Sequence, residues 1–345
     1  MTGRNFLGAC VLAALLAACS SETVAMWPSP PVAFRTGPAT APATSPVTPT
    51  AKERSLAEAY TKALASPGFA ELGSMVEEQV QFTAGARNTH GRDRVKQGHD
   101  DLFGAFDQRH FVANRVWLTD STHPLDSQAL EWTMTGVQAR PFMGIAPTGK
   151  SVAIKGLTLL WTNDDGILSD LHLYFDEEVL TAQLGGGPAE LAKLPPPSLD
   201  AAAPQLFERA GTPEETTNVA TVRAMIQALE DDKEAEFLAT MNDDVELFTL
   251  DRAEPVRGKN AAREYFKTMR NSIHLLDTVV RNAWGVRSFT VTEYVITGLQ
   301  RAPLPRVAFA AGRALHARFV DIAEFREGKM ARIWRYADPS TFASL

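Results

Sequence analysis

The chain has 345 residues, of which 45% are hydrophobic and 22% are charged. This length allows two or three domains, and the composition is that of ordinary globular proteins. The net charge is −7, and no basic cluster occurs anywhere in the sequence. A nucleic-acid-binding surface needs such a cluster, so no nucleic acid partner is expected.

The first residues have the features of a targeting segment. Arg4 precedes a short apolar run over residues 6–16, which is too short to span a bilayer as a permanent helix. The run ends in Leu-Ala-Ala-Cys19 and resembles the bacterial lipoprotein signal, in which the cysteine is lipidated and becomes the first mature residue. We therefore predict a signal peptide over residues 1–18 and lipidation of Cys19. The alternative is an ordinary signal peptide with an unmodified cysteine.

The cysteine count agrees with a lipid anchor. Cys10 and Cys19 are the only cysteines, and Cys10 would be removed with the signal. No disulfide can then form within the mature chain. No aspartate follows Cys19, so its resemblance to sorted lipoproteins implies an outer-membrane position in the bacterial cell envelope. Residues 19–51 are rich in Pro, Ala and Thr, which predicts an extended tether to the membrane.

A first globular module is predicted over residues 52–187. Leu56, Tyr60 and Leu64 recur at helical spacing, and a second short helix is expected over residues 69–75. A short strand and a third helix follow. Four stretches then alternate apolar and polar residues, as half-buried strands do: 111–118, 128–137, 151–161 and 167–174. This order predicts an α+β domain with helices on one face of an antiparallel sheet.

The rest of the chain repeats this programme. A Pro-rich linker is predicted over residues 188–211, and a second module over residues 212–345. Gly136 and Gly298 lie 162 positions apart, as do Tyr174 and Tyr336. The surrounding sequences also correspond, as in Glu-Trp-Thr-Met-Thr-Gly and Glu-Tyr-Val-Ile-Thr-Gly. A constant offset over many positions indicates a duplicated domain.

The first module contains a set of short motifs: Gly91-Arg92, the run from Pro141 to Lys150, Gly156, Asp165-Gly166-Ile167, Asp176 and Gln183-Leu184-Gly185. In these motifs it resembles the SnoaL-like polyketide cyclase, or ester cyclase, family of the nuclear-transport-factor-2-like superfamily. The second module keeps Gly258, Gly328, Trp334 and Asp338 but has lost most of the Pro-Thr-Gly hairpin, so its membership rests on the internal repeat.

The resemblance implies two tandem cone-shaped domains, each a strongly curved sheet wrapped on helices around a deep apolar pocket. It also implies a mechanism without metal or cofactor, in which an acidic residue on the last strand is the general acid/base. That position falls on Asp176 and, in the second module, on Asp338. A carboxylate in an apolar cavity has a raised pKa and can exchange protons near neutral pH.

The sequence departs from the family pattern at several pocket positions. Gln138 and Gln300 replace a histidine that the family commonly shows, and a glutamine side chain cannot transfer protons at neutral pH. His172 stands where the family has a tryptophan, and it is a candidate surrogate base four residues before Asp176. The remaining pocket candidates are Trp132, Tyr294 and Trp334.

No pattern in the sequence indicates a metal or phosphate site. His99-Asp100-Asp101 lacks a recognised metal-ligand spacing and is interpreted as a solvated helix face. Gly185-Gly186-Gly187-Pro188 ends a module and does not follow a strand, so it is not a phosphate loop. No metal and no cofactor are therefore expected.

Three functions remain open from the sequence. The first is an envelope lipoprotein that binds a small, largely apolar molecule in a deep pocket. The second is a cofactor-independent cyclase, isomerase or lyase that uses Asp176, and in the second module Asp338, as general acid/base. The third is a structural or interaction module in which the two domains pack as an intramolecular pseudo-dimer. Because both modules lack the family histidine, binding is favoured over catalysis.

Overall fold

The computed structural model describes residues 51–337, apart from residues 86, 120–126, 198–203, 305 and 308–309. In the first half, three helices, a short 3-10 turn and six strands precede a closing helix. These elements are α1 (Ala51–Ala65), η1 (Pro67–Phe69), α2 (Leu72–Met75), β1 (Val76–Ala84), β2 (Arg87–His90), α3 (Arg92–Phe103), β3 (Phe106–Leu118), β4 (Ser127–Gln138), β5 (Ser151–Thr162), β6 (Leu168–Phe175) and α4 (Glu177–Leu184).

The second half begins with a connecting segment and then repeats helices followed by strands. These elements are η2 (Leu191–Lys193), β7 (Gln205–Glu208), α5 (Pro213–Glu230), α6 (Glu234–Ala239), β8 (Met241–Thr249), β9 (Val256–Arg257), α7 (Gly258–Ser272), β10 (Ile273–Val286), β11 (Phe289–Gln300), β12 (Ala314–Arg326) and β13 (Lys329–Ala337). The segment predicted as a linker thus contains a strand, β7, which pairs in parallel with β3.

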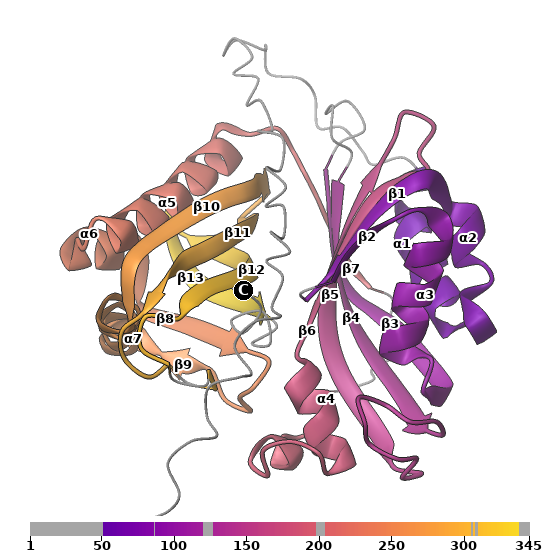
Figure 1. Ribbon diagram of the computed structural model, residues 1–345. Helices are drawn as coiled ribbons and strands as arrows, with labels where there is room; N and C mark the ends of the chain where they lie inside the picture. The colour runs from indigo at the N-terminus through magenta and orange to yellow at the C-terminus, as the bar shows by residue number, and fades with distance from the viewer. Residues whose placement is uncertain are drawn as a thin grey trace, which may run out of the picture. The chain divides into compact units, whose positions relative to one another are not determined.

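The strands form two sheets, one for each copy. The first has the order β2-β1-β6-β5-β4-β3-β7, and the second has the order β10-β11-β12-β13-β8-β9. Most neighbours are antiparallel, and the parallel pairs in these sheets are β1–β6, β3–β7 and β8–β13. Helices α1–α3 cover one face of the first sheet and α5–α7 cover one face of the second (Figure 1). The predicted α+β class, with two curved sheets wrapped on helices, is confirmed.

Local sequence explains where the main helices begin and end. Thr212 and Glu215 form a reciprocal capping box at the start of α5, and proline occupies the first helical turn. Asp176 accepts hydrogen bonds from the backbone N–H groups of Glu178 and Val179 at the start of α4. That helix ends at Gly185, whose φ of 96° is the left-handed conformation that glycine adopts without strain.

The two copies match in backbone detail. The hairpin between β4 and β5 contains an isolated bridge between Phe142 and Ile145, and the loop between β11 and β12 contains one between Leu304 and Val307, each 162 positions further on. Strand β12 departs from this offset. Glu131 pairs with Leu157 on β5, whereas its counterpart Glu293 pairs with Val320 on β12, so the offset along this strand is 163.

Buried apolar side chains form one cluster inside each copy and a third cluster between the two sheets. The third cluster combines residues of both copies, among them Trp117, Leu157 and Tyr174 from the first sheet and Phe289 and Ile322 from the second. Complete burial of such a side chain stabilises the fold by about 1.5–3 kcal/mol. The two copies therefore pack against each other through an extensive apolar contact.

None of the helices in the described part of residues 51–337 combines the length and the apolar character that crossing a membrane requires.

Candidate functional site

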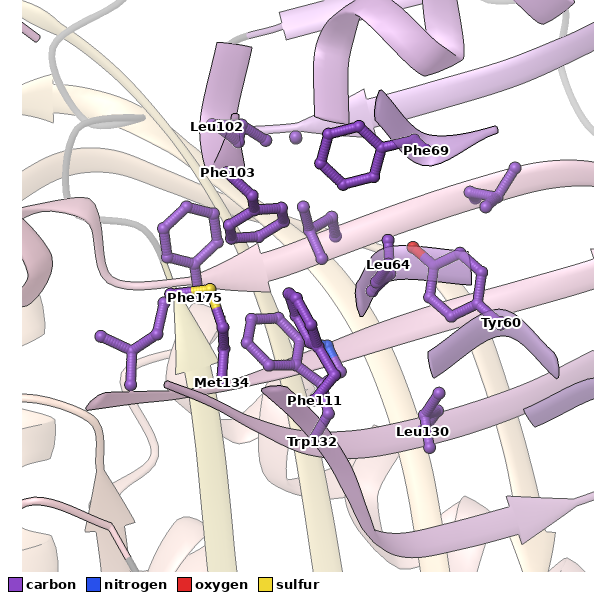
Figure 2. Close-up of a cluster of buried hydrophobic side chains, with 14 of the residues drawn as sticks. Tyr60, Leu64, Phe69, Leu102, Phe103, Phe111, Leu130, Trp132, Met134 and Phe175 are labelled. Atoms are coloured by element: carbon purple, nitrogen blue, oxygen red, sulfur yellow. The ribbon is translucent and has the colours of Figure 1, made fainter. Parts of the chain in front are cut away.

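The interior of the first domain is filled by its own side chains. Figure 2 shows large aromatic and aliphatic groups from helices and strands converging on one another. Phe103 lies 5.4 Å from both Phe111 and Phe175, measured between ring centroids, and 5.9 Å from Trp132. Trp132 is completely buried. The predicted apolar pocket of this domain is thus occupied by packed rings.

Two sequence-predicted pocket residues of the first domain have structural contacts. Trp132 lies over Gly156, where any side chain would overlap the indole ring, and its Nε1 donates a hydrogen bond to Thr158 Oγ1 at 3.0 Å. Gln138 Oε1 accepts hydrogen bonds from the backbone N–H and the hydroxyl of Thr148, at 3.0 and 2.6 Å. Gln138 therefore holds the hairpin together and is not free to contact a ligand.

The second domain contains a cavity between its helices and its sheet. The cavity has a volume of about 50 Å³, or about 630 Å³ when all the space in its open mouth is counted. It therefore suits a small or slender molecule. Its walls are mainly apolar: Met225, Ile226, Leu229, Phe237, Met241, Val245, Leu247, Val256, Gly258, Ala261, Ala262, Tyr265, Thr278, Tyr294, Ile296, Ile333 and Arg335.

A polar triad of Tyr294, Asp321 and Arg335 stands at the sheet side of this cavity; Tyr294 and Asp321 are buried, and the Arg335 side chain is 11% exposed. Arg335 Nε and Nη2 donate to Asp321 Oδ1 and Oδ2 at 2.9 and 2.8 Å, and the Tyr294 hydroxyl donates to Oδ2 at 2.8 Å. Burial opposes the charge of Arg335, but the Asp321 carboxylate outweighs it and raises the arginine pKa well above its ordinary value. The guanidinium also lies 4.9 Å from the ring centroid of Tyr265.

The same three positions are much less polar in the first domain. Thr158 pairs with Leu130 on the sheet and Asp321 pairs with Thr292, so Thr158 is the counterpart of Asp321. Thr158 in turn pairs with Leu173, as Asp321 pairs with Arg335. The first domain thus has Trp132, Thr158 and Leu173 where the second has Tyr294, Asp321 and Arg335. An ion pair and an open cavity occur together in one copy, and packed rings occur in the other.

Asp176, a predicted acid/base, has a different setting. It is 3% exposed and caps α4, and its two carboxylate oxygens accept hydrogen bonds from Nη1 and Nη2 of Arg306 at 2.5 and 2.8 Å. Arg306 belongs to the loop between β11 and β12 of the second domain and also contacts Glu178. Asp176 is therefore a helix cap and an ion-pair partner in a contact between domains. Its counterpart Asp338 lies outside the described residues.

His172 also contacts the second domain. Its Nδ1 lies 2.6 Å from Glu293 Oε1, and its ring packs edge-on against Trp161 at 4.7 Å between centroids. Burial lowers its pKa, but the negative charge of Glu293 more than compensates and raises the pKa to about 10. A histidine so firmly protonated is poorly suited to act as a base near neutral pH.

Of the three pocket residues predicted in the second domain, Tyr294 lines the cavity and the other two do not. Trp334 stacks on Phe248 with centroids 5.4 Å apart and lies under the Arg115 guanidinium of the first domain. It is an interface residue, because neighbouring residues on a strand point to opposite faces and Arg335 takes the cavity side. Gln300 Oε1 accepts from the backbone N–H of Ala310, so this side chain organises its loop as Gln138 does.

The sequence gives little indication that Asp321 and Arg335 belong to a site. A charged residue in a strand of alternating polarity ordinarily lies on the solvated face. An ion pair that points inward therefore cannot be distinguished by this pattern. The available signal was the opposite charge of two residues on successive strands, both within stretches otherwise rich in apolar residues. Across the residues for which the structure gives positions, no three His, Cys, Asp or Glu side chains gather where they could hold a metal ion.

Family comparisons match both copies. A family described as SnoaL-like polyketide cyclase matches residues 54–184, and a family described as SnoaL-like domain matches residues 222–333. No curated protein sequence matches the chain.

Solved structures match one copy at a time. A candidate SnoaL-like polyketide cyclase from Jannaschia sp. CCS1 is 19% identical and covers 39% of this chain and 96% of its own, with a TM-score of 0.35. An LEH-like epoxide hydrolase from M. tuberculosis is 16% identical and covers 38% of this chain and 90% of its own, with a TM-score of 0.32. An NTF2-like protein from Burkholderia xenovorans LB400 is 16% identical and covers 37% of this chain and 95% of its own, with a TM-score of 0.30.

Proposed function

This chain belongs to the SnoaL-like family through two tandem domains, and we propose that it binds a small, largely apolar molecule in the second of them. The observation that carries this proposal is the largely buried ion pair of Asp321 and Arg335 at an otherwise apolar cavity. Burying two charges is costly, and apolar residues of similar size would often stabilise the domain as well or better. The first domain packs its interior without such a pair.

The cavity chemistry indicates the class of ligand. Arg335 uses Nε and Nη2 on Asp321, and its Nη1 has no hydrogen-bond partner among the described residues. This nitrogen can donate to a ligand oxygen. Because Asp321 already balances the arginine charge, a neutral carbonyl or hydroxyl is a better match than a carboxylate. The apolar walls then accommodate a slender hydrocarbon or aromatic body.

Contacts within the triad favour binding over proton transfer. Asp321 accepts three hydrogen bonds, two from Arg335 and one from Tyr294, so its oxygens are engaged by protein donors. Asp176 is engaged by Arg306 and by the first turn of α4. A general base needs an oxygen within hydrogen-bond reach of the substrate proton. The role of Asp176 as an acid/base, and that of Asp338, stay predictions.

The test uses Prodan, a neutral fluorescent ketone with an aromatic body, on the full chain. We expect a blue-shifted emission that titrates to one site. Asp321→Thr with Arg335→Leu installs the residues of the first domain and should weaken binding about three- to tenfold, as the loss of about one hydrogen bond predicts. Ala262→Phe fills the cavity and should abolish the shift.

Thr158→Val is the matched control, because it removes one hydrogen bond in the interior of the first domain. It should leave Prodan binding unchanged. An unshifted emission with the wild type, or equal binding by Ala262→Phe, would refute the proposed binding site.

We further propose that Cys19 anchors the protein by lipid in the bacterial envelope, on the outer membrane. Support comes from the small residues before this cysteine and from the Pro-rich segment after it. Two or more acyl chains suffice for stable anchoring, whereas one gives only reversible binding. Cys19→Ala should move the protein from the membrane fraction to the soluble fraction and abolish labelling by radioactive palmitate. Labelling of the variant equal to that of the wild type would contradict this assignment.

A further inference from the structure

The contact between the two domains contains the same tyrosine–glutamate hydrogen bond twice, once in each direction. The Tyr336 hydroxyl donates to Glu131 Oε1 at 2.6 Å, and the Tyr174 hydroxyl donates to Glu293 Oε1 at 2.5 Å. The tyrosines lie 162 positions apart, and so do the glutamates. Each domain therefore contributes one tyrosine and one glutamate to equivalent contacts, which is the arrangement of a two-fold symmetric dimer interface.

Both glutamates are buried and charged. Glu131 and Glu293 are 2% and 3% exposed. Glu131 receives two hydrogen bonds from Arg115 of its own domain, at 2.7 and 2.9 Å. Glu293 has a neutral neighbour, Asn282, in its own domain and takes its cation, His172, from the first domain. The second domain thus depends on the first to balance a buried charge.

These interface residues alternate along the strands with the triad of the cavity. Glu293 directly precedes Tyr294 on β11, and Tyr336 directly follows Arg335 on β13. Successive residues on a strand point to opposite faces. Asp321 likewise lies between Val320 and Ile322, which belong to the apolar cluster shared by the two domains. Every triad residue is therefore backed by a residue that touches the first domain.

We propose that the first domain positions the ligand site of the second. His172 and Tyr174 hold Glu293, and Glu131 holds Tyr336, so strands β11 and β13 present Tyr294 and Arg335 to the cavity in a fixed arrangement. These first-domain residues act through the strands and do not touch the ligand. The inference rests on the proposed function only in taking the cavity as the working site. It explains why a domain with a filled interior remains joined to an open one.

The test removes only the two hydroxyl groups that cross the interface, in Tyr174→Phe with Tyr336→Phe in the full chain. The control is again Thr158→Val, which removes a buried hydrogen bond to Trp132 in the interior of the first domain and none that crosses the interface. Selective ¹⁵N labelling of arginine gives a signal for the Arg335 Nε–H, which Arg335→Lys assigns by its disappearance. Prodan titration gives the affinity of the same samples.

In the interface variant we expect the Arg335 Nε–H signal to move, its exchange with water to accelerate, and Prodan affinity to fall about three- to tenfold, a typical size for coupling through a packed network. The control should change neither readout. If the interface variant loses stability but matches the control in the Arg335 signal and in Prodan affinity, the interface only holds the domains together and the inference is overturned.

The two proposals fail in different ways. A wild type that does not bind Prodan removes the proposed ligand class, while a shifted Arg335 signal in the interface variant still supports positioning. Should the double variant not fold, Tyr174→Phe alone provides the same comparison, because it removes one of the two contacts of the first domain with Glu293 and leaves the other, from His172, in place.

Discussion

A buried histidine makes the stability of the first domain depend on pH. His99 on α3 is 0% exposed, and its ring lies 4.6 Å from that of Phe82, between centroids. Nδ1 donates to the carbonyl oxygen of Val95 at 2.8 Å, which leaves Nε2 to accept from the Tyr60 hydroxyl at 3.0 Å. Burial disfavours the charged form and outweighs the Val95 contact, so the pKa of His99 falls to about 4.

The size of this pH effect on the free energy of unfolding follows from the difference between the folded and unfolded pKa values of His99. An unfolded histidine titrates near pH 6.5, so between about pH 6.5 and 4 the unfolded chain binds a proton that the folded chain excludes. The free energy of unfolding therefore decreases as pH falls through this window. The difference between the two pKa values corresponds to about 3 kcal/mol, reached when the pH is near 4.

Urea unfolding of the wild type and of His99→Phe between pH 8 and pH 4 tests this. Gly91 and Gly258 stand at the starts of α3 and α7 and lie 167 positions apart, so the residue equivalent to His99 is Phe266. Phe266 is buried, so phenylalanine suits such a core. The carboxylates titrate in both proteins and cancel in the difference. The wild type should lose about 3 kcal/mol more than the variant over this range. Parallel pH profiles would refute the reasoning and show that the folded chain lets His99 bind its proton as readily as the unfolded chain does.

Three further predictions concern stability. Gly156→Ala should cost about 1–3 kcal/mol of unfolding free energy, measured by urea, because a β-carbon there overlaps Trp132; a neutral result would mean that the ring can move. His172 has a folded pKa of about 10, so the stability that its charge provides is complete below about pH 6.5 and is lost as pH rises, by up to about 1.4 kcal/mol of unfolding free energy per pH unit. His172→Gln should flatten this part of the stability–pH profile, and an unchanged slope would contradict the prediction. Asp176→Ala should lower the unfolding free energy by about 2–3 kcal/mol through the lost cap and a weakened Arg306 contact, whereas loss of activity at full stability would point to the acid/base role instead.

Much of the fold could be predicted because alternation and repetition leave strong marks in the sequence. The offset between Gly136 and Gly298 identified the matching strands of the two copies, and the predicted α+β fold class was confirmed. The offset of 163 on β12 could not be predicted, because β5 and β12 share too few residues to fix their alignment. That single position decides that Asp321, and not Val320, faces the cavity.

The two histidines interpreted from the sequence illustrate a second limit. His99 stands beside Asp100 and Asp101, which suggested a solvated face, yet its ring is buried because a helix turns by about 100° per residue and adjacent side chains diverge. His172 was considered as a base within its own domain. Its partner Glu293 lies 121 positions away in the other copy, and no local pattern indicates such a contact.

Covalent fusion of the two copies releases them from a restriction that separate subunits obey. In a symmetric homodimer one gene encodes both halves, so a substitution that plugs one cavity plugs the other as well. Here Trp132 could fill one interior over Gly156 while Tyr294 and Arg335 kept the other open, because each position is encoded independently. The shared tyrosine–glutamate contacts stayed reciprocal while the interiors diverged, so a single polypeptide carries a specialised half and a supporting half in a fixed one-to-one ratio.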